Sequence, residues 1–284
     1  MRVCVVGLGL IGGSFAKAMK EYTWHEVIAH DIGAAIMNIA EMEGAYDKAM
    51  TDDLLSRSDI ILLCLHPDKA IDFVEKNKEK IRKSAVVIDC CGVKRKICEQ
   101  MKPIVDEQGF TFIGGHPMAG TQQWGYGAAR ATLFKGASMI LTPYDTISDE
   151  LMEKLDRFFR EVGFGDVVVT TPEEHDRIIA FTSQLPHIIS SAYIKSPTAQ
   201  EHKGFSAGSY KDMTRVAKVN TRLWAQLFMD NKDNILNEID LMLKHLWQFR
   251  CVIAKDEDVL LHHILDKGNK IKDDMKPGYK NDKD

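Results

Sequence analysis

VCVVGLGLIG, at residues 3–12, is the stretch of this chain that decides its predicted fold. Four apolar residues form a strand-like run that leads directly into a G-x-G-x-x-G pattern made by Gly7, Gly9 and Gly12. In such a turn between a strand and a helix, the first glycine permits the tight turn and the second lets a pyrophosphate approach the backbone. The third lets the helix pack closely on the strand, and the helix N-terminus faces the phosphates. We therefore predict a dinucleotide site at the start of the chain.

The second predicted strand, at residues 26–30, indicates which dinucleotide is bound. Asp31 ends this strand about 20 residues beyond the glycines, where a carboxylate accepts hydrogen bonds from the ribose hydroxyls of NAD. The same carboxylate repels the 2′-phosphate of NADP, so NAD is the predicted cofactor. The alternative is an unrelated α/β protein with a glycine turn, in which Asp31 caps the next helix. The other residues assigned to the cofactor site are Leu10 and Ile11, after the first strand, and Leu65 and His66, at the end of the third.

Length and composition are those of an ordinary enzyme without nucleic-acid or membrane partners. The 284 residues suffice for one large or two medium domains, each with its own core. Acidic residues outnumber basic ones by 41 to 37, which argues against a nucleic-acid surface. The apolar runs are strand-sized and the N-terminus does not resemble a signal peptide, so we expect a cytoplasmic protein. The six cysteines lack metal-ligand spacing, which predicts reduced core thiols and no metal.

Strands and helices alternate through residues 1–170, which is the pattern of a Rossmann-type doubly wound parallel sheet. Besides the two strands above, five more are predicted, at 59–65, 85–89, 110–114, 138–141 and 167–170. Three of the intervening helices are predicted at 67–80, 94–108 and 148–162. Ligands in this architecture bind at the carboxyl ends of the strands, so the catalytic side chains are expected there.

A different pattern begins at Thr171, where Thr-Pro-Glu-Glu forms a capping box with proline at the first helical position. From 171 to 266 the apolar periodicity is helical, whereas residues 267–284 are charged and lack it. We therefore predict an NAD-binding domain at 1–170, a helical substrate domain at 171–266 and a disordered tail at 267–284. The helix at 235–252 has apolar positions on more than one face, which predicts a homodimer through the helical halves.

The best catalytic candidate is His116, in the loop expected after the strand that ends at Gly114. Glycines before and after it allow the backbone to approach a ligand, and Pro117 stiffens the loop. A neutral imidazole there accepts the proton of a substrate hydroxyl while the carbon gives up hydride, as alcohol oxidation requires. The alternative is a loop histidine that is hydrogen-bonded only to backbone.

Two further groups of polar residues lie in the helical half. Lys211 and Arg215 are four residues apart on one helix face, where their repulsion requires a shared anion or an acidic partner such as Asp212. His187 follows Pro186 inside a helical run, and a proline there frees a backbone carbonyl and bends the helix, often beside a cavity. A solvated helix face and a core histidine are the alternative interpretations.

Taken together, these segments resemble the prephenate dehydrogenase family, including its arogenate-using and cyclohexadienyl members. The resemblance runs from residue 1 to about 265, nearly the whole chain, and its glycine turn is shared with many dehydrogenases. The more specific motifs are Asp-x-x-x-Val-Lys at 89–94, His-Pro-x-Ala-Gly-Thr at 116–121, Leu-Pro-His at 185–187, and Lys-Asp-x-Thr-Arg at 211–215 with Trp224 beyond.

The resemblance implies an oxidative decarboxylation in tyrosine biosynthesis. NAD would take hydride from the ring carbon of prephenate that bears the 4-hydroxyl, the ring carboxylate would leave as carbon dioxide, and the product would be 4-hydroxyphenylpyruvate. By the family pattern, His116 is the catalytic residue that hydrogen-bonds the 4-hydroxyl, Arg215 holds the ring carboxylate, and His187 and Lys211 complete the polar wall. The other positions assigned to the substrate are Gly92, Thr121 and Gln122.

The sequence departs from the family pattern at three places. Gly92 stands where many members carry a serine that positions substrate and the catalytic histidine, so Cys91, a backbone amide or water takes over, or the histidine is held more loosely. Gln122 stands where an acidic residue is frequent, and the missing charge favours the keto acid prephenate over the amino acid arogenate. Residues 219–221 replace a common Ser-Asp-Pro, which affects how the helix that carries Trp224 begins.

Prephenate dehydrogenase is thus the predicted function, and arogenate dehydrogenase on the same scaffold is one alternative. A non-catalytic NAD-binding sensor is another, which the glycine at position 92 favours. A two-domain hydroxyacid dehydrogenase would need a catalytic lysine in the first helix of its second domain, and residues 176–189 contain none.

Overall fold

The computed structural model of the chain describes residues 1–144 and 147–275. Contacts divide the chain into two compact units, one of Met1–Lys232 and one that begins at Asp233. The first unit contains the sheet and also the helices that directly follow it. The contacts therefore do not divide the chain at Thr171, and a domain boundary there stays a proposal.

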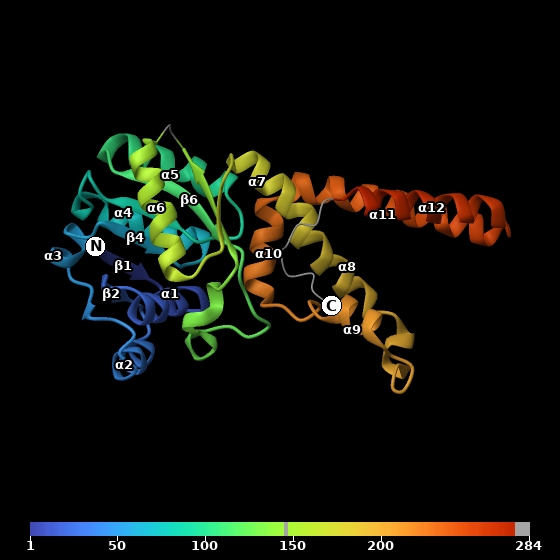
Figure 1. Cartoon of the computed structure of the whole chain (residues 1–284), viewed down its shortest axis with the longest axis horizontal. Helices are drawn as coiled ribbons and strands as arrows, with labels where there is room; N and C mark the ends of the chain where they lie inside the picture. The colour runs from blue at the N-terminus through green and yellow to red at the C-terminus, as the bar shows by residue number, and fades with distance from the viewer. Residues whose placement is uncertain (145–146, 276–284) are drawn as a thin grey trace. The chain divides into compact units, whose positions relative to one another are not determined.

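An eight-stranded sheet forms the centre of the first unit (Figure 1). Its strands are β1 (Arg2–Val6), β2 (Glu26–His30), β3 (Lys48–Ala49), β4 (Ile60–Leu63), β5 (Val86–Asp89), β6 (Thr111–Pro117), β7 (Ser138–Pro143) and β8 (Asp166–Val169). Their order is β3-β2-β1-β4-β5-β6-β7-β8, and all neighbours from β3 to β6 are parallel. This mostly parallel sheet confirms the predicted fold class, and it adds the two-residue β3, which is too short to show a sequence pattern.

The last two strands reverse direction, since β7 is antiparallel to β6 and parallel to β8. A parallel neighbour needs a crossover connection, usually a helix. The link between β6 and β7 instead contains two short 3₁₀ turns, η2 (Tyr126–Ala128) and η3 (Ala131–Phe134). The predicted strand at 138–141 is therefore present, but it runs against the strand before it.

Six helices accompany the strands: α1 (Leu10–Tyr22), α2 (Ala34–Met42), α3 (Asp52–Ser56), α4 (Pro67–Asn77), α5 (Arg95–Gln108) and α6 (Asp149–Val162). Local signals explain their ends. Ser148 caps α6 because its side chain accepts the backbone N–H of Leu151. Both α5 and α6 end at a glycine in the left-handed conformation, Gly109 and Gly163.

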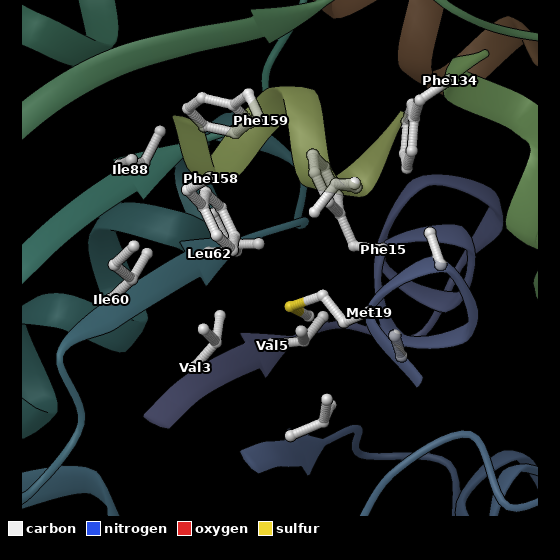
Figure 2. Packing of buried hydrophobic residues seen from close by; sticks show 14 of the residues in the cluster. Val3, Val5, Phe15, Met19, Ile60, Leu62, Ile88, Phe134, Phe158 and Phe159 are labelled. Atoms are coloured by element: carbon white, nitrogen blue, oxygen red, sulfur yellow. The ribbon is translucent and has the colours of Figure 1, made fainter. Parts of the chain in front are cut away.

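The core lies on both faces of the sheet, because successive residues of a strand point to opposite sides. Val3 and Val5 of β1 enter the apolar cluster that α1 and α6 cover, and Figure 2 shows Phe15 of α1 and Phe158 of α6 packed above them. The opposite cluster takes the alternate β1 residues together with side chains of α4 and α5. All six cysteines are free, and three of them are buried.

Strand β6 extends to Pro117, beyond its predicted end at Gly114, so the expected loop position of His116 was wrong. His116 is opposite Ile140 in the antiparallel ladder with β7, and this pairing continues the strand. A Cβ on Gly114 would lie 2.2 Å from Oγ1 of Thr142, and one on Gly115 would lie 2.4 Å from the Asp89 carbonyl oxygen. These two glycines are therefore required by packing inside the protein, not by a ligand.

The helices after the sheet begin with α7 (Pro172–Ile179), capped by Thr171, whose hydroxyl accepts the N–H of Glu174. A π-helical turn (Ala180–Gln184) leads into α8 (Leu185–Tyr193), and η5 (Pro197–Glu201), α9 (Gly208–Thr214) and α10 (Thr221–Asp230) follow. Asn220 caps α10 by accepting the N–H of Leu223. The unusual residues at 219–221 therefore still supply a helix start.

The second unit contains α12 (Asp258–Asp274) and all of α11 (Lys232–Ala254) except Lys232, which belongs to the first unit. Residues 267–274 of the predicted tail thus continue a helix. Charged residues with adequate helix propensity extend an exposed helix without apolar periodicity, which is why the sequence pattern does not show it. Met275 follows the helix, and residues 276–284 of that tail lie outside the described residues. No helix in the described part of the chain combines the length and apolar character of a membrane span.

Candidate active site

The glycine turn lies at the carboxyl end of β1, and its three glycines meet different surroundings. Gly7 has φ of +92°, and a Cβ on it would lie 2.6 Å from the Cys64 carbonyl oxygen. A Cβ on Gly12 would lie 1.8 Å from the carbonyl oxygen of Gly7. A Cβ on Gly9 would meet no described atom within 4 Å. Packing inside the protein therefore requires the first and third glycines, whereas the second leaves open space, where the sequence predicts that a phosphate approaches.

Asp31 joins the glycine turn to the end of β2. Its Oδ2 accepts the backbone N–H of Leu8 at 2.8 Å, and its Oδ1 accepts that of Gly33 at 2.7 Å. An ionised carboxylate has about four lone-pair sites, so each oxygen retains one for a ribose hydroxyl. Asp31 therefore both holds the turn and presents acceptors beside it.

The remaining cofactor candidates also lie at the carboxyl ends of β1 and β4. Leu10 and Ile11 are the first two residues of α1, so their backbone N–H groups belong to its unpaired N-terminus. The Cδ2 atom of Leu65 would lie 2.7 Å from a Cβ on Gly7, which places this side chain against the turn. His66 is the N-cap of α4. Contact of these residues with the cofactor stays a prediction.

A buried ion pair fixes the ends of β5 and β6. Asp89 and Lys94 are both fully buried, and the Nζ of Lys94 pairs with Oδ2 of Asp89 and donates to the Gly115 carbonyl oxygen at 2.6 Å. The Oδ1 of Asp89 accepts the N–H of Gly115 at 3.1 Å. Burial alone would lower the pKa of Lys94, but the charge of Asp89 raises it above its usual value. The Asp-x-x-x-Val-Lys motif is thus a clamp that holds the residue directly before His116.

His116 is half-buried on β6 and forms one end of a chain of side-chain contacts. Its Nδ1 lies 2.8 Å from Nε2 of His175, and Nδ1 of His175 lies 2.7 Å from Oδ1 of Asp176. Burial lowers the pKa of His116 well below its usual value, and the positive charge of Lys94 and the neighbouring His175 lower it further. At neutral pH His116 is therefore a neutral imidazole, as a general base must be.

His175 and Asp176 come from the start of α7, and the sequence prediction did not include them. Both are buried, and Asp176 also accepts the backbone N–H groups of Lys94 at 2.7 Å and Arg95 at 3.0 Å. The one available signal is a His-Asp pair directly after a capping box, at the start of the first helix that follows the sheet. Nothing in a linear sequence pairs it with a strand 59 residues earlier.

A polar network behind Asp176 fixes its position. Asn231, fully buried, donates to the Asp176 carbonyl oxygen at 2.8 Å and to Oε1 of Gln184 at 2.6 Å, and it accepts from Arg95 at 3.0 Å. Gln184 in turn donates to the Leu227 carbonyl oxygen at 3.0 Å. The network ties α5, α7 and α10 together, so the residues around His116 belong to one hydrogen-bonded assembly.

Gly92 lies beside His116, as the resemblance implies. A Cβ on it would lie 4.0 Å from Nε2 of His116 and 3.3 Å from Cδ1 of Leu227. The thiol of Cys91 is directed to the Leu65 carbonyl oxygen at 3.5 Å, so Cys91 does not replace the missing serine hydroxyl. The orientation of His116 is instead fixed by its contact with His175.

His187 lies where the proline prediction places it, at a distortion of the helix. The π-helical turn ends directly before α8, and Nδ1 of His187 lies 2.8 Å from the Ser183 carbonyl oxygen. Its ring stacks on Trp224 with centroids 3.8 Å apart. Burial lowers the pKa of His187, and the positive charge of Arg215 lowers it further. His187, Trp224 and Arg215 are therefore neighbours, although their contact with substrate stays a prediction.

Gln122 connects the loop after β6 to the end of α9. Its Nε2 donates to the backbone carbonyl oxygen of Arg215 at 2.7 Å. A carboxylate could not make this hydrogen bond, because it has no donor. The neighbouring Thr121 forms a local turn through its hydroxyl, which donates to the Gln123 carbonyl oxygen at 2.9 Å.

The surrounding segment, residues 195–222, is strongly cationic. It contains two acidic residues and six basic ones: Lys195, Lys203, Lys211, Arg215, Lys218 and Arg222. All six are exposed, and within 1–144 and 147–275 no ion pair is found for any of them. Asp212 therefore does not serve as the acidic partner that the alternative interpretation requires.

Comparison with known proteins places these features in one family. The family model described as "Prephenate dehydrogenase, nucleotide-binding domain" matches residues 15–170, and "Prephenate dehydrogenase, dimerization domain" matches 171–267. Cyclohexadienyl dehydrogenase of Zymomonas mobilis is 30% identical over 273 residues, which are 92% of each chain.

Two crystal structures extend the similarity to the fold. Prephenate dehydrogenase from A. aeolicus, in complex with hydroxyphenyl propionate and NAD+, is 28% identical with a TM-score of 0.82, over 96% of each chain. Arogenate dehydrogenase from Synechocystis is also 28% identical with a TM-score of 0.81, over 96% of this chain and 99% of its own.

Proposed function

The chain belongs to the prephenate dehydrogenase family of oxidoreductases, and from this membership and the site geometry we propose that it converts prephenate to 4-hydroxyphenylpyruvate in tyrosine biosynthesis. The observation that carries the proposal is His116. It lies on the strand next to β5, with one nitrogen hydrogen-bonded to His175 and the other beside Gly92, and burial lowers its pKa well below the usual value.

NAD is the cofactor, and the residues present fit it. Gly9 leaves room for a pyrophosphate, the N-terminus of α1 supplies unpaired N–H groups, and Asp31 retains lone pairs for ribose hydroxyls. When bound, NAD accepts the hydride from the substrate. The chain's own residues bind the substrate and accept its hydroxyl proton.

Two alanine substitutions separate the roles of the glycines. We expect Gly9→Ala to leave stability within about 1 kcal/mol, because its methyl group enters open space, and to weaken NAD binding about tenfold or more. Gly12→Ala is expected to cost about 3 kcal/mol of unfolding free energy, because its methyl group overlaps a backbone carbonyl. Urea unfolding measures the free energy of unfolding of each variant, and calorimetric titration measures its affinity for NAD. Equal loss of stability in both variants would contradict this assignment.

The proposed reaction uses His116 as general base. The Nε2 of His116 accepts the proton of the 4-hydroxyl, and the O–H bonding electrons form the carbonyl as hydride leaves the carbon. Release of the ring carboxylate as carbon dioxide then aromatises the ring, which supplies the driving force. His116 is suited to this because burial keeps it unprotonated and the Asp89–Lys94 clamp holds the neighbouring backbone.

The cationic segment supports an anionic substrate. Prephenate carries two carboxylates, and we assign the ring carboxylate to Arg215, with Lys211 and His187 nearby. Arg215 is exposed and lacks an ion pair among the described residues, so its guanidinium is available. An exposed Arg215 also grips less tightly than a buried one, which suits a carboxylate that must depart.

Arogenate dehydrogenase is the second candidate, and Gln122 is the observation that bears on it. Arogenate carries an amino group where prephenate carries a keto group, and a carboxylate at position 122 would attract that amine. Here the residue is a neutral amide whose donor is directed to the Arg215 backbone. We therefore propose that prephenate is preferred.

A two-substrate assay tests the proposal. The protein is incubated with NAD and either prephenate or arogenate, and the absorbance of the reduced cofactor is followed. We expect kcat/KM to be at least about tenfold higher for prephenate, since each 1.4 kcal/mol of discrimination is tenfold. A higher value for arogenate would reverse the assignment, and turnover of neither would reject both.

We also propose a homodimer formed through the helical half. The match of residues 171–267 to a family model named for dimerisation supports it, as do exposed apolar residues of α11 such as Leu243, Leu246 and Trp247. Sedimentation that gives the mass of one chain at working concentration would reject this proposal.

A further inference from the structure

The hydrogen-bonded chain of Asp176, His175 and His116 determines where each imidazole carries its proton. An ionised carboxylate only accepts hydrogen bonds. Asp176 accepts two backbone N–H groups, so Nδ1 of His175, at 2.7 Å, must be the donor to its Oδ1. In neutral His175 the other nitrogen, Nε2, is then an acceptor.

The same reasoning extends to His116. Because Nε2 of His175 is an acceptor, Nδ1 of His116, at 2.8 Å, must carry the proton and donate it. A neutral His116 then has its lone pair on Nε2, the nitrogen that lies beside Gly92. This is the nitrogen that a substrate hydroxyl needs as acceptor, and the opposite tautomer would present a donor instead.

We propose that His175 and Asp176 are positioning residues that lock His116 in the Nδ1-protonated tautomer and so keep its Nε2 available as the base. The proposal rests on the proposed function in one respect, the identity of the hydroxyl that Nε2 deprotonates. In the reaction the substrate proton moves to Nε2, and the resulting imidazolium keeps donating its Nδ1–H to His175. When the ring carboxylate leaves as carbon dioxide, the electrons of the broken C–C bond pass to the ring oxygen, which takes the proton back from Nε2 to form the phenol, so no further acceptor is needed.

The charges around His175 favour this arrangement. Asp176 on its own helix and Asp89 on β5 are negative, Lys94 is positive, and His116 on β6 faces its Nε2. Burial lowers the pKa of His175, and Lys94 lowers it further against the opposing effect of the two carboxylates. His175 is therefore neutral at neutral pH and has an acceptor to offer.

Hydrogen bonds to neighbouring elements fix the positions of Asp176, His175 and His116. Asp176 and His175 lie on α7. The Asp176 carbonyl oxygen accepts from Asn231, which directly follows α10 and accepts in turn from Arg95 of α5. The carboxylate receives N–H groups from the first residues of α5, while the ion pair of Lys94 holds the strand under His116. Asp176 and the backbone beside His116, the two ends of the hydrogen-bonded series, are thus both fixed to residues 89–95.

Two substitutions at position 175 test the proposal. In His175→Gln, the amide oxygen can accept from His116 while the NH₂ group donates to Asp176, so the tautomer is kept. In His175→Phe, both contacts are lost. We expect His175→Gln to keep kcat within about tenfold and His175→Phe to lower it by about 10² or more, with KM changed little in both, since a misplaced general base affects the chemical step.

The tautomer is read directly by ¹⁵N NMR of protein labelled at histidine, without substrate. Wild type and His175→Gln are expected to show protonated Nδ1 and unprotonated Nε2 on His116, assigned through its loss in His116→Asn, and His175→Phe is expected to lose this preference. His263→Gln, an exposed histidine on α12, is the matched control. Circular dichroism confirms that each variant is folded, and His175→Gln carries the test if His175→Phe does not fold.

The outcomes separate this inference from the proposed function. If wild type turns over neither prephenate nor arogenate, the proposed function fails, while the NMR result still decides the tautomer. An Nε2-protonated His116 in wild type would overturn the inference whatever the substrate. It would equally be overturned if a folded His175→Phe kept the wild-type kcat, or if a folded His175→Gln showed the Nε2-protonated tautomer.

Discussion

Replacing His116 with asparagine should lower kcat by about 10³, within the range that general-base catalysis contributes. Asparagine is close in size and can still hydrogen-bond His175, but it cannot take up a proton. NAD binding should be unchanged, because the glycine turn and Asp31 directly follow β1 and β2 and make no hydrogen bond to His116 among the described residues. Absorbance of the reduced cofactor gives kcat, and calorimetric titration gives the affinity for NAD.

The control for this substitution is His263→Asn, the same change at an exposed position of α12. It should leave both quantities as in wild type. If His116→Asn retained most of the activity, His116 would not be the base. If it lost NAD binding as well, the effect would be structural and the role assigned to Nε2 would be unsupported.

Replacing Lys94 with methionine should lower the unfolding free energy by about 3–5 kcal/mol, the cost of leaving one partner of a buried ion pair uncompensated. Asp89 would keep its charge in the core without a counter-ion, and the Gly115 carbonyl oxygen would lose its donor. The loss should be largely recovered in Asp89→Asn/Lys94→Met, which removes both charges. Urea unfolding at neutral pH measures all three free energies.

Lys102→Met is the matched control for the Lys94 substitution. Lys102 lies on the same helix, α5, and pairs with Asp106 at 2.8 Å, but both side chains are exposed to solvent. Its replacement should leave the urea midpoint unchanged, because solvent already satisfies the carboxylate. A similar loss of stability in both variants would show that burial of the Asp89–Lys94 pair is not what makes it important.

The parts of this protein that depend on neighbouring residues could be predicted from its sequence. The glycine turn, the start of α1 near Leu10 and the helix start at Thr171 are local patterns, and the structure has all three, although Glu174 of the predicted capping box pairs with Arg177. The sheet followed from the alternation of apolar runs, because each run is long enough to be recognised alone. The two-residue β3 and the reversed direction of β7 depend on pairing between distant strands, which no local pattern records.

The candidate site shows the same division. His116 could be chosen from its position near the carboxyl end of a strand, but its partner His175 lies on another element and is joined to it only by folding. The sequence predicts that Gly114 and Gly115 make room for a ligand, but a side chain at either position would instead overlap Thr142 or Asp89. In both cases the missing information is which buried groups meet, and sequence spacing does not contain it.

The π-helical turn between α7 and α8 has a consequence for how this chain tolerates change in length. A π turn holds one residue more than an α turn, and removal of one residue from an α-helix rotates everything after it by about 100°. A single deletion within Ala180–Gln184 would therefore convert the π turn into an α turn and leave the His187 ring on Trp224, whereas a second deletion there would turn the ring away. The direction of His187 is thus encoded in a number of residues as much as in their identity.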